Sequence, residues 1–331
     1  MAQLYSLNDS IDGFFNNHTS VTRQQCDDFV AAHFQTPAEP VPIQGFWSYT
    51  LMAGDDNATI IQFRSESSPL EEENLQLIKE AATGFVPDVV CLGTIGQHRP
   101  LHIYKMNKLP GSPYVLAVDL SIKPPECAAQ RQENTIRDFA KFFAQSWNYN
   151  PPTLPNRAAL SQEYEPKIRR LMESLPEQFF PSLFSVIPRF RTIFSDLPLV
   201  VTHGDLCGLN ILINETSGHI TGIIDWAEMR ILPFGFALWG LENILGFMDT
   251  NGWHYYDNHA ALRALFWETF RFHAVNFTEK DMALVAKARV LGLFVRYGFD
   301  TEDETALRVV DESDASTWAY LNAFCGSDGA N

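Results

Sequence analysis

The sequence predicts an α+β protein in two parts, a small antiparallel sheet with one helix followed by a larger, mainly helical region. Short β-rich runs are concentrated in residues 1–107, whereas long runs with helical periodicity fill most of residues 108–331. The turn signal Leu109-Pro110-Gly111 ends the segment 104–111, which is expected to be a short hinge between the two regions. Because 46% of the 331 residues are hydrophobic, the chain can bury a large core.

Turn residues and β-rich runs alternate in the first region. The polar stretch Gly54-Asp55-Asp56-Asn57 lies between two such runs and predicts an antiparallel hairpin. Pro69 and the acidic residues after it open a helix in the way that the helix dipole favours. The expected elements are a helix at 21–34, strands at 45–53 and 57–64, a helix at 69–82, and strands at 89–92 and 101–106.

The second region is expected to be helical apart from three short apolar runs near its middle. The expected helices lie at 128–147, 164–180, 184–194, 234–248, 260–275, 279–297 and 315–324. The expected strands lie at 199–203, 211–213 and 220–226.

The composition excludes several kinds of protein. The chain has 24 basic and 40 acidic residues, a net charge of −16, which argues against a nucleic-acid partner because phosphate contacts need clustered Lys and Arg. This charge permits an amine-bearing substrate, although solubility alone explains it as well. The five cysteines form no CxxC pair, and no signal peptide or membrane-spanning run is evident. We therefore expect a soluble, cytoplasmic protein with no membrane partner.

One stretch of the second region carries groups suited to chemistry. A strand ends at His203-Gly204-Asp205, and Asn210 precedes the run at 211–213. The run at 220–224 then ends in Asp225, and a turn between these two strands makes them a hairpin with Asn210 and Asp225 near its open end. Their side-chain oxygens suit a hard cation such as Mg²⁺, which leaves Asp205 to accept a proton. Phosphoryl transfer requires such parts.

This stretch resembles the aminoglycoside phosphotransferase and choline kinase-like family of small-molecule kinases, which share a bilobal protein-kinase-like fold. The family's catalytic loop reads approximately HGDxxxxNxL, and its metal motif reads IDW or IDF; this chain has Ile224-Asp225-Trp226 at the second motif, 20 residues after Asp205. The resemblance implies a kinase that uses ATP and Mg²⁺, with Asp205 as catalytic base and Asn210 and Asp225 as metal ligands. It also implies that His203 is mainly architectural.

The resemblance assigns ATP binding to residues 1–107 and catalysis and substrate binding to residues 108–331. Related kinases hold the ATP phosphates with a cation on a strand, fixed by a carboxylate on a helix. Arg64 stands where Lys is usual, and arginine keeps the charge. Its expected partner is Glu73, with Glu72 as the alternative.

Two further segments are expected to contact ATP. The phosphate-covering loop would be residues 44–49, which are not glycine-rich, so backbone amides and the Ser48 hydroxyl would hold the phosphates. The adenine would bond to backbone groups near Met106 and Asn107, in the hinge.

The sequence departs from the family after the metal motif. Many members carry an acidic residue there, in a GDPxxDL-like segment that braces the catalytic loop, whereas this chain has Pro233-Phe234-Gly235-Phe236-Ala237-Leu238. Glu242 and Glu268 are candidate contacts for a substrate amine. Five aromatic residues could form a cage for a cation, line an apolar pocket or belong to the core: Trp226, Trp239, Trp253, Trp267 and Phe270.

The leading hypothesis is a kinase that phosphorylates a hydroxyl of a small molecule. A catalytically inactive nucleotide-binding pseudokinase or scaffold is the alternative, and a metal-dependent hydrolase is a third. Aminoglycosides, choline-like amines, sugars and amino-acid alcohols all stay open as acceptors, because the pocket and not the fold decides the substrate. The sequence indicates no oligomeric state.

Overall fold

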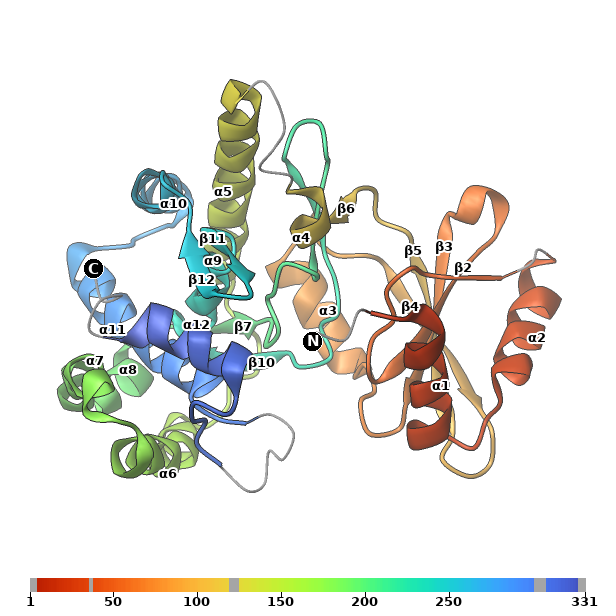
Figure 1. Ribbon diagram of the computed structural model, residues 1–331, viewed down its shortest axis with the longest axis horizontal. Coiled ribbons are helices and arrows are strands. Elements are labelled where there is room, and N and C mark those ends of the chain that lie inside the picture. The colour runs from red at the N-terminus through yellow and green to blue at the C-terminus, as the bar shows by residue number, and fades with distance from the viewer. Residues whose placement is uncertain (1–4, 36–37, 119–124, 301–307, 327–331) are drawn as a thin grey trace. The chain divides into compact units, whose positions relative to one another are not determined.

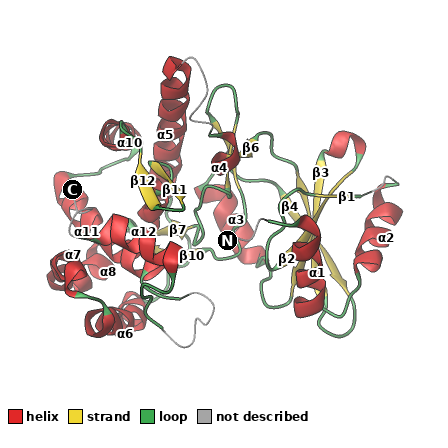
Figure 2. Cartoon of the chain, in the orientation of Figure 1, coloured by secondary structure: helices red, strands yellow, loops and turns green. Residues whose placement is uncertain are grey.

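The computed structural model describes residues 5–35, 38–118, 125–300 and 308–326, which divide into two compact units (Figure 1). The first unit comprises Met1–Lys79 and Gly84–Pro110, and the second comprises Glu80–Thr83 and Gly111–Asn331. The predicted fold class is confirmed, since the first unit contains an antiparallel sheet and the second is mostly helical (Figure 2). The roles given to residues 1–107 and 108–331 stay predictions.

The first unit is built on an antiparallel sheet with strand order β1-β2-β3-β5-β4. The predicted hairpin forms its centre, with a 3₁₀ turn at Asp55–Asn57 between β2 and β3. The elements are α1 Leu7–His18, α2 Arg23–Phe34, β1 Glu39–Pro40, β2 Ser48–Ala53, β3 Thr59–Ser65, α3 Glu72–Ala81, β4 Val89–Ile95 and β5 Leu101–Asn107.

Helices α1 and α2 pack against this sheet and contribute apolar side chains to its core. Ile11 and Phe14 of α1 and Val30 of α2 are buried in one cluster with β-strand residues such as Leu51 and Phe63. The sequence pattern predicted a helix where α2 lies, and it gave no bounds for α1. Both helices begin at side-chain caps, which satisfy backbone N–H groups of their first turns.

The second unit surrounds short sheets with helices (Figure 1). Its helices are α4 Tyr114–Ala117, α5 Pro125–Asn148, α6 Arg157–Ser174, α7 Phe180–Val186, α8 Phe190–Asp196, α9 Trp239–Glu242, α10 His259–His273, α11 Glu279–Tyr297 and α12 Ala315–Cys325. Its strands are β6 Ser112–Pro113, β7 Leu199–Thr202, β8 Ile211–Ile213, β9 Ile220–Ile223, β10 Arg230–Pro233, β11 Gly246–Asp249 and β12 Gly252–Tyr255.

Aromatic residues at helical spacing join α5 to α10. Phe139 and Phe143 lie four residues apart on α5 and are buried, and the Phe143 ring lies 5.8 Å from the ring of Phe266 on α10. Edge-to-face contacts of this kind add to the burial energy. No helix among the residues described is long and apolar enough to cross a membrane.

Three expected helices differ from the structure. The helix predicted at 184–194 is divided into the end of α7, a 3₁₀ turn at Ile187–Arg189 and most of α8. The helix predicted at 164–180 begins earlier, because Asn156 caps α6 through its side chain, and it ends before Pro176. The helix predicted at 234–248 is a 3₁₀ turn, the short α9 and strand β11. The observed β11–β12 hairpin requires Gly246, since a Cβ there would lie 2.2 Å from the His254 carbonyl oxygen.

Candidate active site

The loop after β7 carries the first part of the motif. Its turn needs Gly204, which has a φ of +83° and whose Cβ position would lie 2.2 Å from the Glu228 carbonyl oxygen. Strand β7 is itself fixed by antiparallel pairing with β10, and the Thr202 hydroxyl donates to the Arg230 carbonyl oxygen at 2.8 Å. The glycine in the His-Gly-Asp motif is therefore required by close backbone packing.

His203 fastens the loop to the segment that carries Asp225. Its Nδ1 accepts a hydrogen bond from the backbone N–H of Asp205 at 3.2 Å, so the proton lies on Nε2, which donates to the Ile224 carbonyl oxygen at 2.8 Å. Burial lowers the pKa of His203 below its ordinary value of 6.5, so the ring is neutral. The ring also lies 4.5 Å from that of Trp226. These contacts are those of an architectural histidine.

Asp205 and Asn210 are in direct contact. The Nδ2 group of Asn210 donates to the Asp205 backbone oxygen at 2.8 Å and to its Oδ2 at 2.9 Å. The Cys207 sulfur lies 3.9 Å from the same Oδ2. One carboxylate oxygen of Asp205 is thus oriented by the loop itself.

Asn210 and Asp225 lie at the same end of the β8–β9 hairpin. Ile211 pairs with Ile223, and the backbone N–H of Ile224 donates to the Asn210 carbonyl oxygen at 2.9 Å. Asp225 has a left-handed backbone with a φ of 62°, which non-glycine residues rarely adopt, and its side chain is exposed. This turn ends strand β9 at Ile223, earlier than the predicted range of 220–226.

These two residues suit a magnesium ion. Asn210 makes its described hydrogen bonds through Nδ2, so within the described part of the chain its Oδ1 has no protein partner. Among the residues described, no three or more His, Cys, Asp and Glu side chains form a metal cluster. One amide oxygen and one carboxylate match the partial set with which Mg²⁺ binds alongside phosphates and water.

A residue that sequence reasoning missed completes the contacts of Asp205. Arg296, at the end of α11, donates through Nη2 to Asp205 Oδ1 at 2.6 Å, and its guanidinium lies 4.8 Å from the ring centre of Trp239. The two residues are 91 positions apart in the chain. The sequence feature that could have drawn attention to Arg296 is that it is the only charged residue in the run 290–299.

The segment after the metal motif braces the loop through apolar packing. Leu206 is fully buried, and the position of a Cβ on Gly240 would lie 2.8 Å from its side chain. The segment at 233–240 therefore meets the loop that carries Asp205 through close apolar contact between Leu206 and Gly240.

The prediction that Glu242 contacts a substrate amine is wrong. It has no exposed surface, and its carboxylate pairs at 2.6 Å with Arg263 and at 2.6 Å with Arg289. The Tyr255 hydroxyl also donates to it at 2.9 Å. Of the aromatic residues proposed as a cage, three are core: Trp226, Trp239 and Phe270.

In the first unit, the structure brings together Arg64 and Ser48. They are directly opposite in the β2–β3 pairing, and the Gln62 side chain contacts both, with Nη1 of Arg64 donating to its Oε1 at 3.2 Å. Arg64 also donates to the Ser68 carbonyl oxygen at 2.7 Å. Arg64 is thus buried and held in place by its own strand and the turn after it.

The other predicted nucleotide contacts lie on α3 and at the end of β5. Glu72 and Glu73 are both exposed in the first turn of α3, and the pairing of either with Arg64 stays a prediction. Met106 is half-buried and Asn107 is exposed. The Asn107 side chain accepts a hydrogen bond from the Asp88 backbone at 2.7 Å, which ties β5 to the start of β4.

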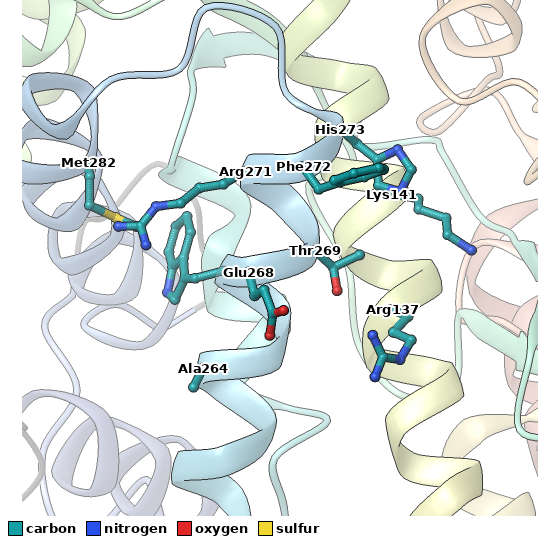
Figure 3. Close-up of a pocket in the computed structure, with 10 residues that line it drawn as sticks. Arg137, Lys141, Ala264, Glu268, Thr269, Arg271, Phe272, His273 and Met282 are labelled. Carbon is teal, nitrogen blue, oxygen red and sulfur yellow. The ribbon is translucent and has the colours of Figure 1, made fainter.

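A groove of about 760 Å³ lies elsewhere in the second unit, along α5 and α10 (Figure 3). Glu268 lines it, together with cationic side chains that already face carboxylates: Arg137 faces Glu133, Lys141 faces Asp138, and Arg271 faces Glu279. Two residues that the sequence analysis singled out, Trp267 and Glu268, thus line this groove, whereas Asp205, Asn210 and Asp225 do not.

Solved structures of antibiotic phosphotransferases share the fold. Macrolide 2′-phosphotransferase type I is 17% identical, with a TM-score of 0.54 over 88% of this chain and 99% of that chain. A ternary complex of aminoglycoside phosphotransferase APH(4)-Ia with AMP-PNP and hygromycin B is 13% identical, with a TM-score of 0.54 over 89% and 95%. Amicoumacin kinase with AMP-PNP and Ca²⁺ is 12% identical, with a TM-score of 0.52 over 91% and 93%.

Sequence comparison supplies the family. No curated protein matches the chain in sequence. Residues 60–265, more than half of the chain, do match the phosphotransferase enzyme family, and they include Arg64, Asp205, Asn210 and Asp225. The resemblance inferred from the motifs is confirmed: the chain belongs to the phosphotransferase enzyme family of small-molecule kinases.

Proposed function

We propose that this kinase transfers the γ-phosphoryl group of ATP to a hydroxyl of a small molecule, with Asp205 as the base. The observation that carries the proposal is the convergence of His203 and Asn210 on Asp205. His203 accepts a hydrogen bond from the backbone N–H of Asp205, and Asn210 donates a hydrogen bond to its Oδ2. A carboxylate held in this way can align the hydroxyl and accept its proton.

The reaction balances as an in-line displacement. The hydroxyl oxygen forms a bond to the γ-phosphorus, the bond from that phosphorus to the bridging oxygen breaks, and ADP leaves. The proton of the hydroxyl passes to Asp205 and then to water. Asp205 therefore positions the attacking oxygen. Arg64 and Ser48 are proposed to supply a cation and a hydroxyl for the nucleotide phosphates, for which their buried side chains must become accessible.

Asn210 and Asp225 are the residues proposed to hold Mg²⁺. The support is the partner-free Oδ1 of Asn210 within the described residues and the exposed carboxylate of Asp225, at one end of the same hairpin. A bound Mg²⁺ would neutralise the phosphate charge. Solved relatives with AMP-PNP, one of them also with Ca²⁺, are consistent with this arrangement.

The test is ATP turnover with a panel of hydroxyl compounds, comparing the wild type with Asp205→Asn and Asp225→Asn. We expect Asp205→Asn to lower kcat/KM by about 10²- to 10⁴-fold, the usual contribution of a positioned base. Asp257→Asn is the matched control, because Asp257 is exposed on a loop of the same unit. Turnover that survives both active-site changes would refute the proposal, and Mg-ATP binding without any turnover would favour the pseudokinase.

A further inference from the structure

The two carboxylate oxygens of Asp205 have different surroundings. Oδ2 is bound by Asn210 of the same loop, whereas Oδ1 is bound by Arg296 from a distant helix. If Asp205 is the base, the oxygen not held by its own loop is the one that must meet the acceptor hydroxyl. Arg296 therefore lies where the acceptor arrives.

Arg296 has unused binding capacity. A guanidinium carries five N–H donors, and within the described residues one hydrogen bond of Arg296 is found, the one from Nη2 to Asp205. Its side chain is 28% exposed, and the Trp239 ring supports it on one side. Its remaining donors are thus available to a ligand while the residue stays anchored.

Neutral phenol groups also lie near Arg296 among the described residues. Burial raises the pKa of Tyr320 on α12, and the charge of Arg296 opposes that rise, so the phenol lies within electrostatic reach of the guanidinium. Tyr320 stacks on Tyr297 with ring centres 5.0 Å apart. Since Glu242 is buried and paired, the described carboxylate that meets Arg296 is Asp205 itself.

We propose that Arg296 is an acceptor-binding residue, and that the acceptor carries an anionic group, a carboxylate or a phosphate, next to the hydroxyl that is phosphorylated. The inference rests on the proposed function. The anionic group takes the guanidinium in place of Asp205 Oδ1, and Oδ1 then faces the hydroxyl. An amine at that position would instead be repelled by the positive charge of Arg296. The net negative charge of the chain is therefore not taken to indicate an amine-bearing acceptor.

Arg296 also lies beyond residue 265, outside the segment that matches the family. A contact supplied from outside that segment is consistent with a role in choosing the acceptor rather than in the phosphoryl transfer that the family shares.

The experiment uses matched acceptor sets in which the group next to the hydroxyl is anionic, neutral or cationic. Phenyllactate, its amide, and the amino alcohol with an aminomethyl group in place of the carboxylate form one set. Glycerate, glyceramide and aminopropanediol form the other. Binding to the intact chain with Mg-AMP-PNP is measured by calorimetry, and kcat/KM is measured with Mg-ATP, for the wild type, Arg296→Gln and the control Arg271→Gln, whose ion pair with Glu279 is exposed.

We expect the acid of at least one set to bind and react best, by roughly 10- to 100-fold over its amide, with the amino alcohol poorest. Arg296→Gln should bring the acid-to-amide ratio close to one, and Arg271→Gln should leave it unchanged. Equal losses for all three members would assign Arg296 to the phosphoryl group and overturn the inference. So would tighter binding of the amino alcohols, or failure of both acids to bind the wild type.

Failure of the proposed function has a different signature. In that case Asp205→Asn would not change ATP turnover, whatever the charge of the acceptor. Acid binding that depends on Arg296 would still be visible by calorimetry, because it does not require the reaction.

Discussion

Two arginines seven residues apart on α11 each donate to a carboxylate at 2.6 Å, yet the two ion pairs differ in kind. Arg289 meets Glu242, which has no exposed surface and is also bound by Arg263 and Tyr255. Arg296 meets Asp205, and the two side chains of that pair are 28% and 29% exposed. The first carboxylate is saturated and serves the fold, whereas the second has solvent access and can exchange its partner for a ligand.

The largest expected effect tests the buried pair. Glu242→Gln leaves two guanidinium groups without a charged partner, and removing one member of a buried ion pair costs about 3–5 kcal/mol. Urea unfolding monitored by circular dichroism measures the loss in the free energy of unfolding. A cost close to that of Asp205→Asn, which we expect to stay below about 1 kcal/mol, would remove the distinction between the two pairs.

The loop that presents Asp205 gives the next effect. Gly204→Ala places a Cβ against the Glu228 backbone at a positive φ, so we expect a loss of about 1–3 kcal/mol in stability together with reduced turnover. The control is Gly13→Ala in α1, where nothing lies within 4 Å of the added methyl group and helix propensity favours alanine. Thermal unfolding should move in opposite directions for these two variants.

His203 should make stability depend on pH. Its folded-state pKa is lowered, so below pH 6.5 the unfolded chain binds a proton that the folded chain excludes. The contribution of this residue should fall as the pH drops below 6.5, by at most about 1.4 kcal/mol per pH unit. The measurement is the free energy of unfolding as a function of pH for the wild type and for His203→Gln. The difference between the two slopes gives the contribution of His203. Identical slopes would mean that folding does not lower the pKa of His203.

The smallest effect concerns the exposed pair. Arg296→Gln should change the free energy of unfolding by less than about 1 kcal/mol, because a partly exposed ion pair is screened by solvent. Denaturant unfolding of this variant beside Glu242→Gln measures the difference directly. A loss as large as that of the buried pair would mean that Arg296 serves mainly the fold.

The sequence predicted what local spacing determines. Asp205, Asn210 and Asp225 lie within one loop and one hairpin, so strand patterns and a turn between them were enough to place Asn210 and Asp225 at the same end. Arg296 could not be found in this way, because its contact depends on how α11 packs against the loop, 91 residues later. The β11–β12 hairpin was missed for a similar reason, since its aromatic residues also fit a helix and its requirement for Gly246 is visible only once the hairpin has formed.

Cys207 has a practical consequence for chemical studies of this enzyme. Burial and the neighbouring Asp205 carboxylate raise the pKa of its thiol, so the sulfur stays protonated near neutral pH. Alkylating reagents and peroxides attack thiolates, and a protonated sulfur reacts with them slowly. Thiol reagents should therefore leave Cys207 and the loop that carries Asp205 largely unmodified.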